Sequence, residues 1–200
     1  MELNLIPYKE GTDGFHMLWC PNDPNISPQS QEGCEKISLD VARERGKKEG
    51  LKVGTPEFLK SGQGNWVAQG KTIVGQIEYD NKPEDDWTCD TWNKDTDMNL
   101  VRLDIWSPHE GKGHGKAALR EQHAEWKRQN KKSVVLFPAL TEEPGTFASI
   151  LNKKNPVSTM PFYEKVGYQP SKRCRLDWSE YPDVKEKYRE RNPPIMEMFL

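Results

Sequence analysis

The stretch NLVRLDIWSPHEGKGHGKAALR, residues 99–120, decides the fold. Apolar and other side chains alternate over 99–106, which predicts a strand with one buried face. Three glycines then occupy the five positions 111–115, and the good helix formers of 116–130 predict a helix. The stretch therefore predicts a strand, a tight glycine turn and a helix in immediate succession.

The glycine turn has the chemistry of an anion site. Glycines remove the side chains that would keep a ligand away from the backbone. The first N–H groups of the following helix have no internal partner, and the helix dipole adds positive potential there. Lys112, Lys116 and Arg120 add positive charge on the same side. The sequence therefore predicts a phosphate site over Gly111–Lys116, with a flexible loop that binds nothing as the alternative.

The sequence departs from two common nucleotide-binding motifs at positions that those motifs need for their function. A Walker loop would need glycine at 110 and a hydroxyl at 117, where the chain has Glu110 and Ala117. A dinucleotide fingerprint that starts at Gly111 would need its third glycine where Lys116 stands. Neither nucleotide hydrolysis nor a dinucleotide cofactor is therefore predicted.

Hydrophobic periodicity and turn residues predict further elements. Strands are expected at Leu3–Tyr8, Asn65–Ala68, Lys71–Tyr79, Ser133–Pro138 and Ile195–Leu200, and helices at Glu35–Glu49 and Thr159–Val166. The second and third strands should form a hairpin around Gln69–Gly70, with Ile73, Val74 and Ile77 buried. On the helix after the glycine turn, His123 is expected to pack against the core.

Composition limits the class of protein. The 200 residues carry 29 Lys+Arg and 31 Asp+Glu, a net charge of -2, which predicts one folded domain over 1–200. No apolar run approaches the roughly 20 residues of a membrane span. The charge also argues against nucleic-acid binding, although Lys127, Arg128, Lys131 and Lys132 form a small basic patch. We expect neither a membrane nor a nucleic-acid partner, and a monomer or a homodimer.

The cysteines bear on the cellular compartment. Cys20, Cys34, Cys89 and Cys174 lie far apart, with no C-x-x-C pair. Because the start of the chain does not read as a secretory signal, this pattern predicts free thiols in a reducing compartment, and hence a cytoplasmic protein. A zinc site at His16, Cys20 and Cys34 lacks the tight ligand pairing of four-ligand sites, so no metal is expected.

An acidic segment precedes the long strand. Residues 78–97 hold eight acids against Lys82 and Lys94, eight minus two giving a net charge of -6, and they include Trp87 and Trp92. One interpretation is a solvated loop. The other is a wall that attracts a cationic substrate, with the indole rings adding cation–π attraction.

The glycine turn resembles the pyrophosphate-binding turn of the GNAT acetyltransferase superfamily, written Q/R-x-x-G-x-G/A. Gly113 and Gly115 fit its glycine positions, whereas Glu110 stands where Gln or Arg is usual. A second segment, PFYEKVGY at 161–168, resembles the family's late aromatic-Tyr-x-x-x-Gly-aromatic run. The spacing of the two segments and the order of the expected elements agree with that fold. The resemblance covers about residues 65–170.

The resemblance implies an α+β, GNAT-like fold with a mixed, mostly antiparallel central sheet flanked by helices. It divides the domain into a variable acceptor-side region at 1–64, a core at 65–170 and terminal strands at 171–200. It also implies acetyl-CoA as co-substrate, without a metal. The residues implied in binding it are Ile105, Trp106 and Ser107 along the pantetheine arm, and Gly111, Lys112, Gly113, His114, Gly115 and Lys116 at the pyrophosphate.

The resemblance further implies N-acetyl transfer to a primary amine by direct attack. Tyr163 would protonate the departing thiolate, or else serve as a core aromatic. A carboxylate would act as base, and the candidates are Glu78, Asp97 and Asp104. Asp104 stands inside an apolar strand, which a role in the site or a salt bridge with Arg102 would explain.

Two expectations concern specificity and alternatives. The acidic segment predicts a cationic acceptor, such as a polyamine, an amino sugar or a basic peptide. The His114 ring is expected to face solvent or phosphate. Because Glu110 departs from the family pattern, a GNAT-fold module that binds CoA or a partner without catalysis is the alternative function.

Overall fold

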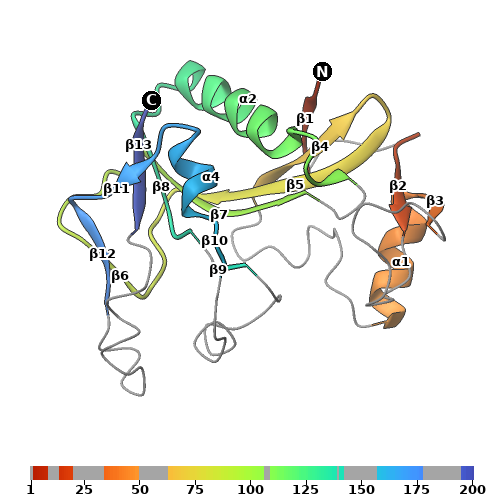
Figure 1. Ribbon diagram of the computed structural model, residues 1–200, viewed down its shortest axis with the longest axis horizontal. Helices are drawn as coiled ribbons and strands as arrows, with labels where there is room; N and C mark the ends of the chain where they lie inside the picture. The colour runs from red at the N-terminus through yellow and green to blue at the C-terminus, as the bar shows by residue number, and fades with distance from the viewer. Residues whose placement is uncertain are drawn as a thin grey trace. The chain divides into compact units, whose positions relative to one another are not determined.

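The computed structural model describes residues 2–8, 14–19, 34–49, 63–105, 109–138, 140–141, 157–177 and 195–200 (Figure 1). The chain forms two compact units. The first contains Met1–Tyr79 and Val101–Glu125, and the second contains Asp80–Leu100 and Trp126–Leu200. The long strand β7 (Asp97–Ile105) contributes its first residues to the second unit and its last residues to the first.

The first unit is built on four neighbouring strands. Their order is β1-β4-β5-β7, where β1 is Asn4–Pro7, β4 is Gly64–Gln69 and β5 is Thr72–Asp80. Strand β1 pairs with β4, and β4 with β5, in antiparallel fashion. A smaller pair, β2 (His16–Trp19) and β3 (Glu35–Ser38), joins β5 through a parallel contact of His16 with Thr72.

The predicted β4–β5 hairpin is confirmed. Ile73, Val74 and Ile77 have no exposed surface, as their apolar pattern required. Gly70 adopts a φ of +58° in the turn, a left-handed conformation that glycine tolerates. The pairing register shifts between Val67 and Ala68, which marks a β-bulge in this hairpin.

The predicted helix at Glu35–Glu49 is wrong over its first four residues. These residues form β3, and only Leu39–Glu49 forms helix α1. Ile37 is buried opposite Met17 of β2, so strand pairing overrides local helix propensity here. The Ser38 hydroxyl accepts a hydrogen bond from the Val41 N–H at 3.3 Å, which makes Ser38 the N-cap of α1.

Helix α2 (His114–Arg128) follows the glycine turn and begins two residues earlier than predicted. Its buried face includes Leu119, Trp126 and His123, so the expectation that His123 packs in the core is confirmed. Within the first unit, the Asn65 side chain of β4 donates a buried hydrogen bond to Gln122 of α2 at 2.7 Å. This contact fixes α2 against β4.

The second unit continues from the first residues of β7. Strand β7 pairs in parallel with β8 (Ser133–Leu136), β8 pairs antiparallel with β13 (Met196–Phe199), and β13 with β11 (Gln169–Pro170). Two short antiparallel pairs lie off this path: β6 (Trp87–Cys89) with β12 (Cys174–Leu176), and β9 (Leu140–Thr141) with β10 (Val157–Ser158). A short helix, α4 (Met160–Glu164), falls within the predicted Thr159–Val166.

The predicted fold class is confirmed. The central sheet is mixed: most of its described pairings are antiparallel, while β7–β8 and the short β2–β5 contact are parallel. Helices accompany this sheet, as an α+β fold requires. In the described part of the chain, none of the helices has the length and apolarity needed to cross a membrane.

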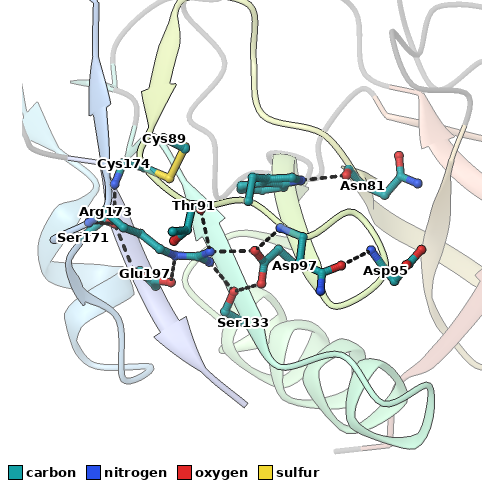
Figure 2. A network of polar contacts seen from close by, with 12 residues as sticks. Asn81, Cys89, Thr91, Asp95, Asp97, Ser133, Ser171, Arg173, Cys174 and Glu197 are labelled. Carbon is teal, nitrogen blue, oxygen red and sulfur yellow. Dashed lines mark hydrogen bonds and ion pairs between the residues drawn. A yellow bond between two sulfur atoms is a disulfide. The ribbon is translucent and has the colours of Figure 1, made fainter.

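The expectation of free thiols is wrong. Cys89 and Cys174 face each other across β6 and β12, with Cα atoms 4.1 Å apart, and form a disulfide (Figure 2). Cys34 is disulfide-bonded as well. The pairing of Cys89 with Cys174 bridges 85 residues and depends on a strand pair that sequence spacing does not reveal. Because disulfides persist in oxidising compartments, the cytoplasmic assignment loses the support it took from free thiols.

A half-buried arginine, Arg173, lies beside this disulfide (Figure 2). The Arg173 guanidinium donates to Glu197 at 2.6 Å and to Asp97 at 2.6 Å, and it also donates to the Ser133 hydroxyl. Burial tends to raise the pKa of Asp97, but hydrogen bonds from Arg173, the Asn93 N–H and Ser133 leave that pKa below its usual value. One cation therefore holds β7, β8 and β13 to the segment that precedes β12.

Removal of this cation should cost far more than removal of its exposed neighbour. Arg173→Ala leaves Asp97 and Glu197 buried without their counter-ion, which should lower the free energy of unfolding by about 3–5 kcal/mol. Arg175 pairs with Asp90 at 2.9 Å on the surface, so Arg175→Ala should cost about 0–1 kcal/mol. Urea denaturation of both variants measures the difference, and equal costs would contradict a structural role for the Arg173 cluster.

A close approach of β5 to β7 gives a second prediction. A Cβ atom added at Gly75 would lie 2.1 Å from the Asp104 carbonyl oxygen, a backbone atom that cannot rotate away. Gly75→Ala should therefore destabilise by about 1–3 kcal/mol or more. At Gly70 an added Cβ meets nothing within 4 Å among the described residues, so Gly70→Ala should cost only its left-handed strain of about 1–2 kcal/mol. Thermal melts of the two variants would refute this account if Gly70→Ala proved the more damaging.

Candidate functional site

The glycine turn occupies His109–Gly113, directly before α2. Gly111 and Gly113 have φ values of +70° and +82°, and an added Cβ at either would meet nothing within 4 Å among the described residues. Backbone conformation rather than crowding therefore requires glycine at both positions. The predicted order of strand, glycine turn and helix is confirmed.

The turn presents the N-terminus of α2. The Ala117 N–H donates to the Gly113 carbonyl at 3.1 Å, which makes this carbonyl the first acceptor of the helix. The preceding N–H groups, up to that of Lys116, consequently have no intrahelical acceptor. They point along the helix axis at its positive end, which is the geometry of a phosphate site.

The charged side chains near the turn are accessible. Lys112, Lys116 and Arg120 are exposed, so they can meet an anion at the same end of α2. Glu110 is exposed as well, so its carboxylate can turn toward solvent. The local balance of these four side chains is three positive charges against one negative charge, which favours an anionic ligand.

The expectation that the His114 ring faces solvent or phosphate is wrong. His114 is 2% exposed, and its ring points into the first unit. Its Nδ1 atom lies 3.1 Å from the His109 carbonyl, and its Nε2 atom lies 3.3 Å from Oε1 of Gln69 at the end of β4. The ring therefore supports the turn from within, and only the backbone of His114 remains available to a ligand.

His109 is a residue of this region that sequence reasoning missed. Its ring is 7% exposed and lies edge-to-face with His114, with ring centroids 6.0 Å apart. Burial, followed by the positive charges of Lys112 and His114, lowers the pKa of His109 to about 4. Pro108 and the glycines beside it mark a turn in the sequence, but they do not indicate an inward-facing ring.

Two of the predicted carboxylates lie in the first unit, near Tyr8. Asp104 on β7 accepts a hydrogen bond from Gln76 at 2.9 Å and lies 3.6 Å from Arg102. Burial raises its pKa, although Gln76 and Arg102 oppose this shift. Glu78 on β5 is 2% exposed, and burial together with Glu78 and Asp104 raises the pKa of the Tyr8 hydroxyl. Glu78 and Asp104 thus share one electrostatic environment.

The remaining predicted residues divide as follows. Ile105 ends β7 and is half-buried. Trp106 and Ser107 lie outside the described residues. In the second unit, Tyr163 of α4 is half-buried, and its ring lies edge-to-face with Phe162 at 5.1 Å and Tyr168 at 5.6 Å. These contacts fit a packing role and leave part of the Tyr163 side chain accessible.

Some acidic side chains of the 78–97 segment form ion pairs within the protein. Asp97 binds Arg173, and Asp90 pairs with Arg175. Trp92 donates its indole N–H to the Asn81 carbonyl at 2.9 Å, and the Arg173 guanidinium lies 5.7 Å from the centre of its ring. The Trp92 ring therefore already has a cation beside it, which weakens the expectation that it would receive a cationic substrate.

No group of three or more His, Cys, Asp or Glu side chains is placed to hold a metal ion among the residues that the structure describes.

Comparisons with known proteins give similar solved structures. No family model matches the sequence, and a search of curated proteins found no match. The chain is similar to an aminoglycoside 6'-N-acetyltransferase complexed with coenzyme A (15% identity, covering 100% of this chain and 97% of that one, TM-score 0.48). It is also similar to Ard1 from Thermoplasma volcanium (14% identity, covering 83% of this chain and 82% of that one, TM-score 0.43). A third similar structure is a GNAT family acetyltransferase from Elizabethkingia anophelis with acetyl-CoA bound (14% identity, covering 69% of this chain and 76% of that one, TM-score 0.41). These values are too low to support an argument about activity.

The buried His109 predicts a pH dependence of stability. Its pKa in the folded protein, about 4, lies below the ordinary value of 6.5, so the unfolded chain binds more protons between these two values. Stability should therefore fall as the pH drops from about 6.5 toward 4. His109→Phe, which keeps an aromatic ring and removes the titration, should flatten this part of the curve of unfolding free energy against pH. An unchanged slope in that variant would show that His109 does not cause the dependence.

Proposed function

We propose that this protein is an acetyl-CoA-dependent N-acetyltransferase of the GNAT type that acts on a primary amine. The observation that carries the proposal is the turn at the end of β7, where Gly111 and Gly113 take left-handed φ values and open onto the N-terminus of α2. The sequence resemblances at 110–115 and 161–168 add to it. The family assignment is part of the same proposal.

The proposed co-substrate fits the turn by charge and shape. The pyrophosphate of CoA would accept hydrogen bonds from backbone N–H groups over Gly111–Lys116, and Lys112 and Lys116 would balance its charge. The pantetheine arm would pair with the backbone at the end of β7, from Ile105 to Ser107. The thioester carbonyl would then receive a hydrogen bond from an N–H group near Ile105, which stabilises negative oxygen as the amine attacks.

The proposed reaction needs a base and an acid. The neutral amine attacks the thioester carbonyl, the C–S bond breaks, and the CoA thiolate takes a proton. Asp104 is the base that the local geometry favours, because its raised pKa makes the carboxylate more basic and about two-fifths of its side chain is exposed. Glu78 is the second candidate and would reach the amine only through water, because it is 2% exposed. Tyr163 is the proposed acid, from its place in PFYEKVGY.

We also propose that the acceptor carries positive charge. Asp85 and Asp95 are exposed, and the 78–97 segment carries a net charge of -6 before pairing with Arg173 and Arg175. Such a surface raises the local concentration of cations. This attraction would depend on charge, because the Trp92 ring already has the Arg173 guanidinium beside it.

A non-catalytic CoA-binding module is the second candidate. It is favoured by Glu110, an exposed carboxylate beside the proposed pyrophosphate site. The two candidates differ in turnover. Release of free thiol from acetyl-CoA, measured over a panel of polyamines, amino sugars, basic peptides and neutral amines, supports the enzyme. Binding of CoA with no thiol release for any amine supports the module.

For the enzyme, the Michaelis constant of a cationic acceptor should rise with salt, because exposed charges are screened beyond about 10 Å at 0.1 M.

Acetyl-CoA should stabilise the folded protein. At a hundredfold excess over the dissociation constant, the gain is about 2.7 kcal/mol, which raises the melting temperature. Gly113→Glu should abolish this shift, because it places a long, negatively charged side chain at a left-handed position beside the proposed phosphate site. Gly70→Glu, a left-handed glycine in the β4–β5 turn, is the matched control and should retain the shift. Absence of any shift with millimolar CoA in the wild type would overturn the proposal.

Tyr163→Phe should slow acetyl transfer while leaving the affinity for acetyl-CoA nearly unchanged. Loss of a general acid typically lowers the rate by about a hundredfold to ten-thousandfold. Tyr168→Phe is the control, since Tyr168 is buried and its hydroxyl has no proposed part in the reaction. Single-turnover rates separate the chemical step from product release. Equal rates for wild type and Tyr163→Phe would assign Tyr163 to packing alone.

A further inference from the structure

The glycine turn is exposed and rich in glycine. All four residues from Glu110 to Gly113 are exposed, and two of them are glycines. Glycine loses more conformational entropy on ordering than any other residue, so a turn of this composition that is not already ordered must become ordered when it binds an anion, which lowers its affinity. Contacts made by the residues at its two ends can reduce this cost.

The His114 ring ties three segments together at one end. Its Nδ1 atom faces the His109 carbonyl, which can only accept, so Nδ1 carries a hydrogen and donates it at 3.1 Å. Its Nε2 atom faces the Gln69 side chain at 3.3 Å. The ring therefore links the first residue of α2 to β4 and to the start of the turn.

The His109 ring holds the other end. It is 7% exposed and lies against His114 at nearly a right angle, 83° between ring planes. Its Nε2 atom is buried and has no hydrogen-bond partner within the described residues. A buried polar atom without a partner is unfavourable, so an apolar side chain would fill this space at a lower cost in free energy. The presence of an imidazole here therefore favours a specific role for the ring.

We infer that His109 and His114 are positioning residues that hold the glycine turn in the conformation that binds pyrophosphate, although neither side chain touches the ligand. The inference rests on the proposed function, because it concerns the same turn. The buried rings hold the backbone N–H groups of the turn in place, and this preorganisation raises the affinity for pyrophosphate. It also separates two halves of the co-substrate: the phosphates depend on the rings, whereas the pantetheine arm, bound at the end of β7, does not.

The test compares acetyl-CoA with S-acetylpantetheine, which has the thioester and lacks the pyrophosphate. His114→Leu should raise the Michaelis constant for acetyl-CoA by at least about tenfold at an unchanged turnover number, and should leave kcat/KM for S-acetylpantetheine unchanged. His114→Asn, which retains a donor near the Nδ1 position, should recover much of the affinity. His123→Leu, at an equally buried histidine of α2, should lower the melting temperature and preserve the preference for acetyl-CoA.

The Gln69→Leu variant separates loss of the His114 contact from misfolding of the protein. Gln69 is exposed, so this change should leave the fold intact while it removes the partner of Nε2, and the preference for acetyl-CoA should fall. A folded His114→Leu or Gln69→Leu variant with the wild-type preference would overturn the inference. If the wild type fails to bind CoA at all, the proposed function falls, whereas CoA binding that ignores both variants removes only the role of the histidines.

Discussion

The left-handed backbone at Gly111 and Gly113 is the constraint on which the site depends. It shapes the turn directly before α2, whose first N–H groups have no intrahelical acceptor. Any residue with a Cβ atom would be strained at either position, even though that Cβ would meet nothing within 4 Å among the described residues. We propose that the turn, the lysines beside it and the buried histidines together form one anion-binding site in the first unit.

The second unit shows a different use of charge. Arg173 is a half-buried cation shared between Asp97 and Glu197, and its guanidinium also lies beside the Trp92 ring of the acidic segment. Acidic residues that read as a continuous surface in the sequence therefore divide into paired and exposed groups. Only the exposed group, which includes Asp85 and Asp95, can act on a substrate at a distance.

Local patterns predicted much of the fold, and long-range pairing accounts for what they missed. The β4–β5 hairpin, β7 and α2 were predictable because each has strong periodicity and glycine at its turn. Glu35–Ser38 forms a strand because it pairs with β2, and β6 and β12 are too short to give a signal of their own. For the site, glycine spacing located the turn, but whether His114 faces inward depends on Gln69, which is distant in sequence.

The proposed function requires that the N–H groups at the start of α2 bind the pyrophosphate of CoA. Amide ¹H–¹⁵N chemical shifts of the labelled protein, titrated with CoA and separately with pantetheine, test it most directly. The account predicts that CoA shifts the amides of Gly111–Lys116 and that pantetheine, which lacks the phosphates, leaves them in place. Amides in this stretch that do not respond to CoA, or that respond equally to pantetheine, would contradict it.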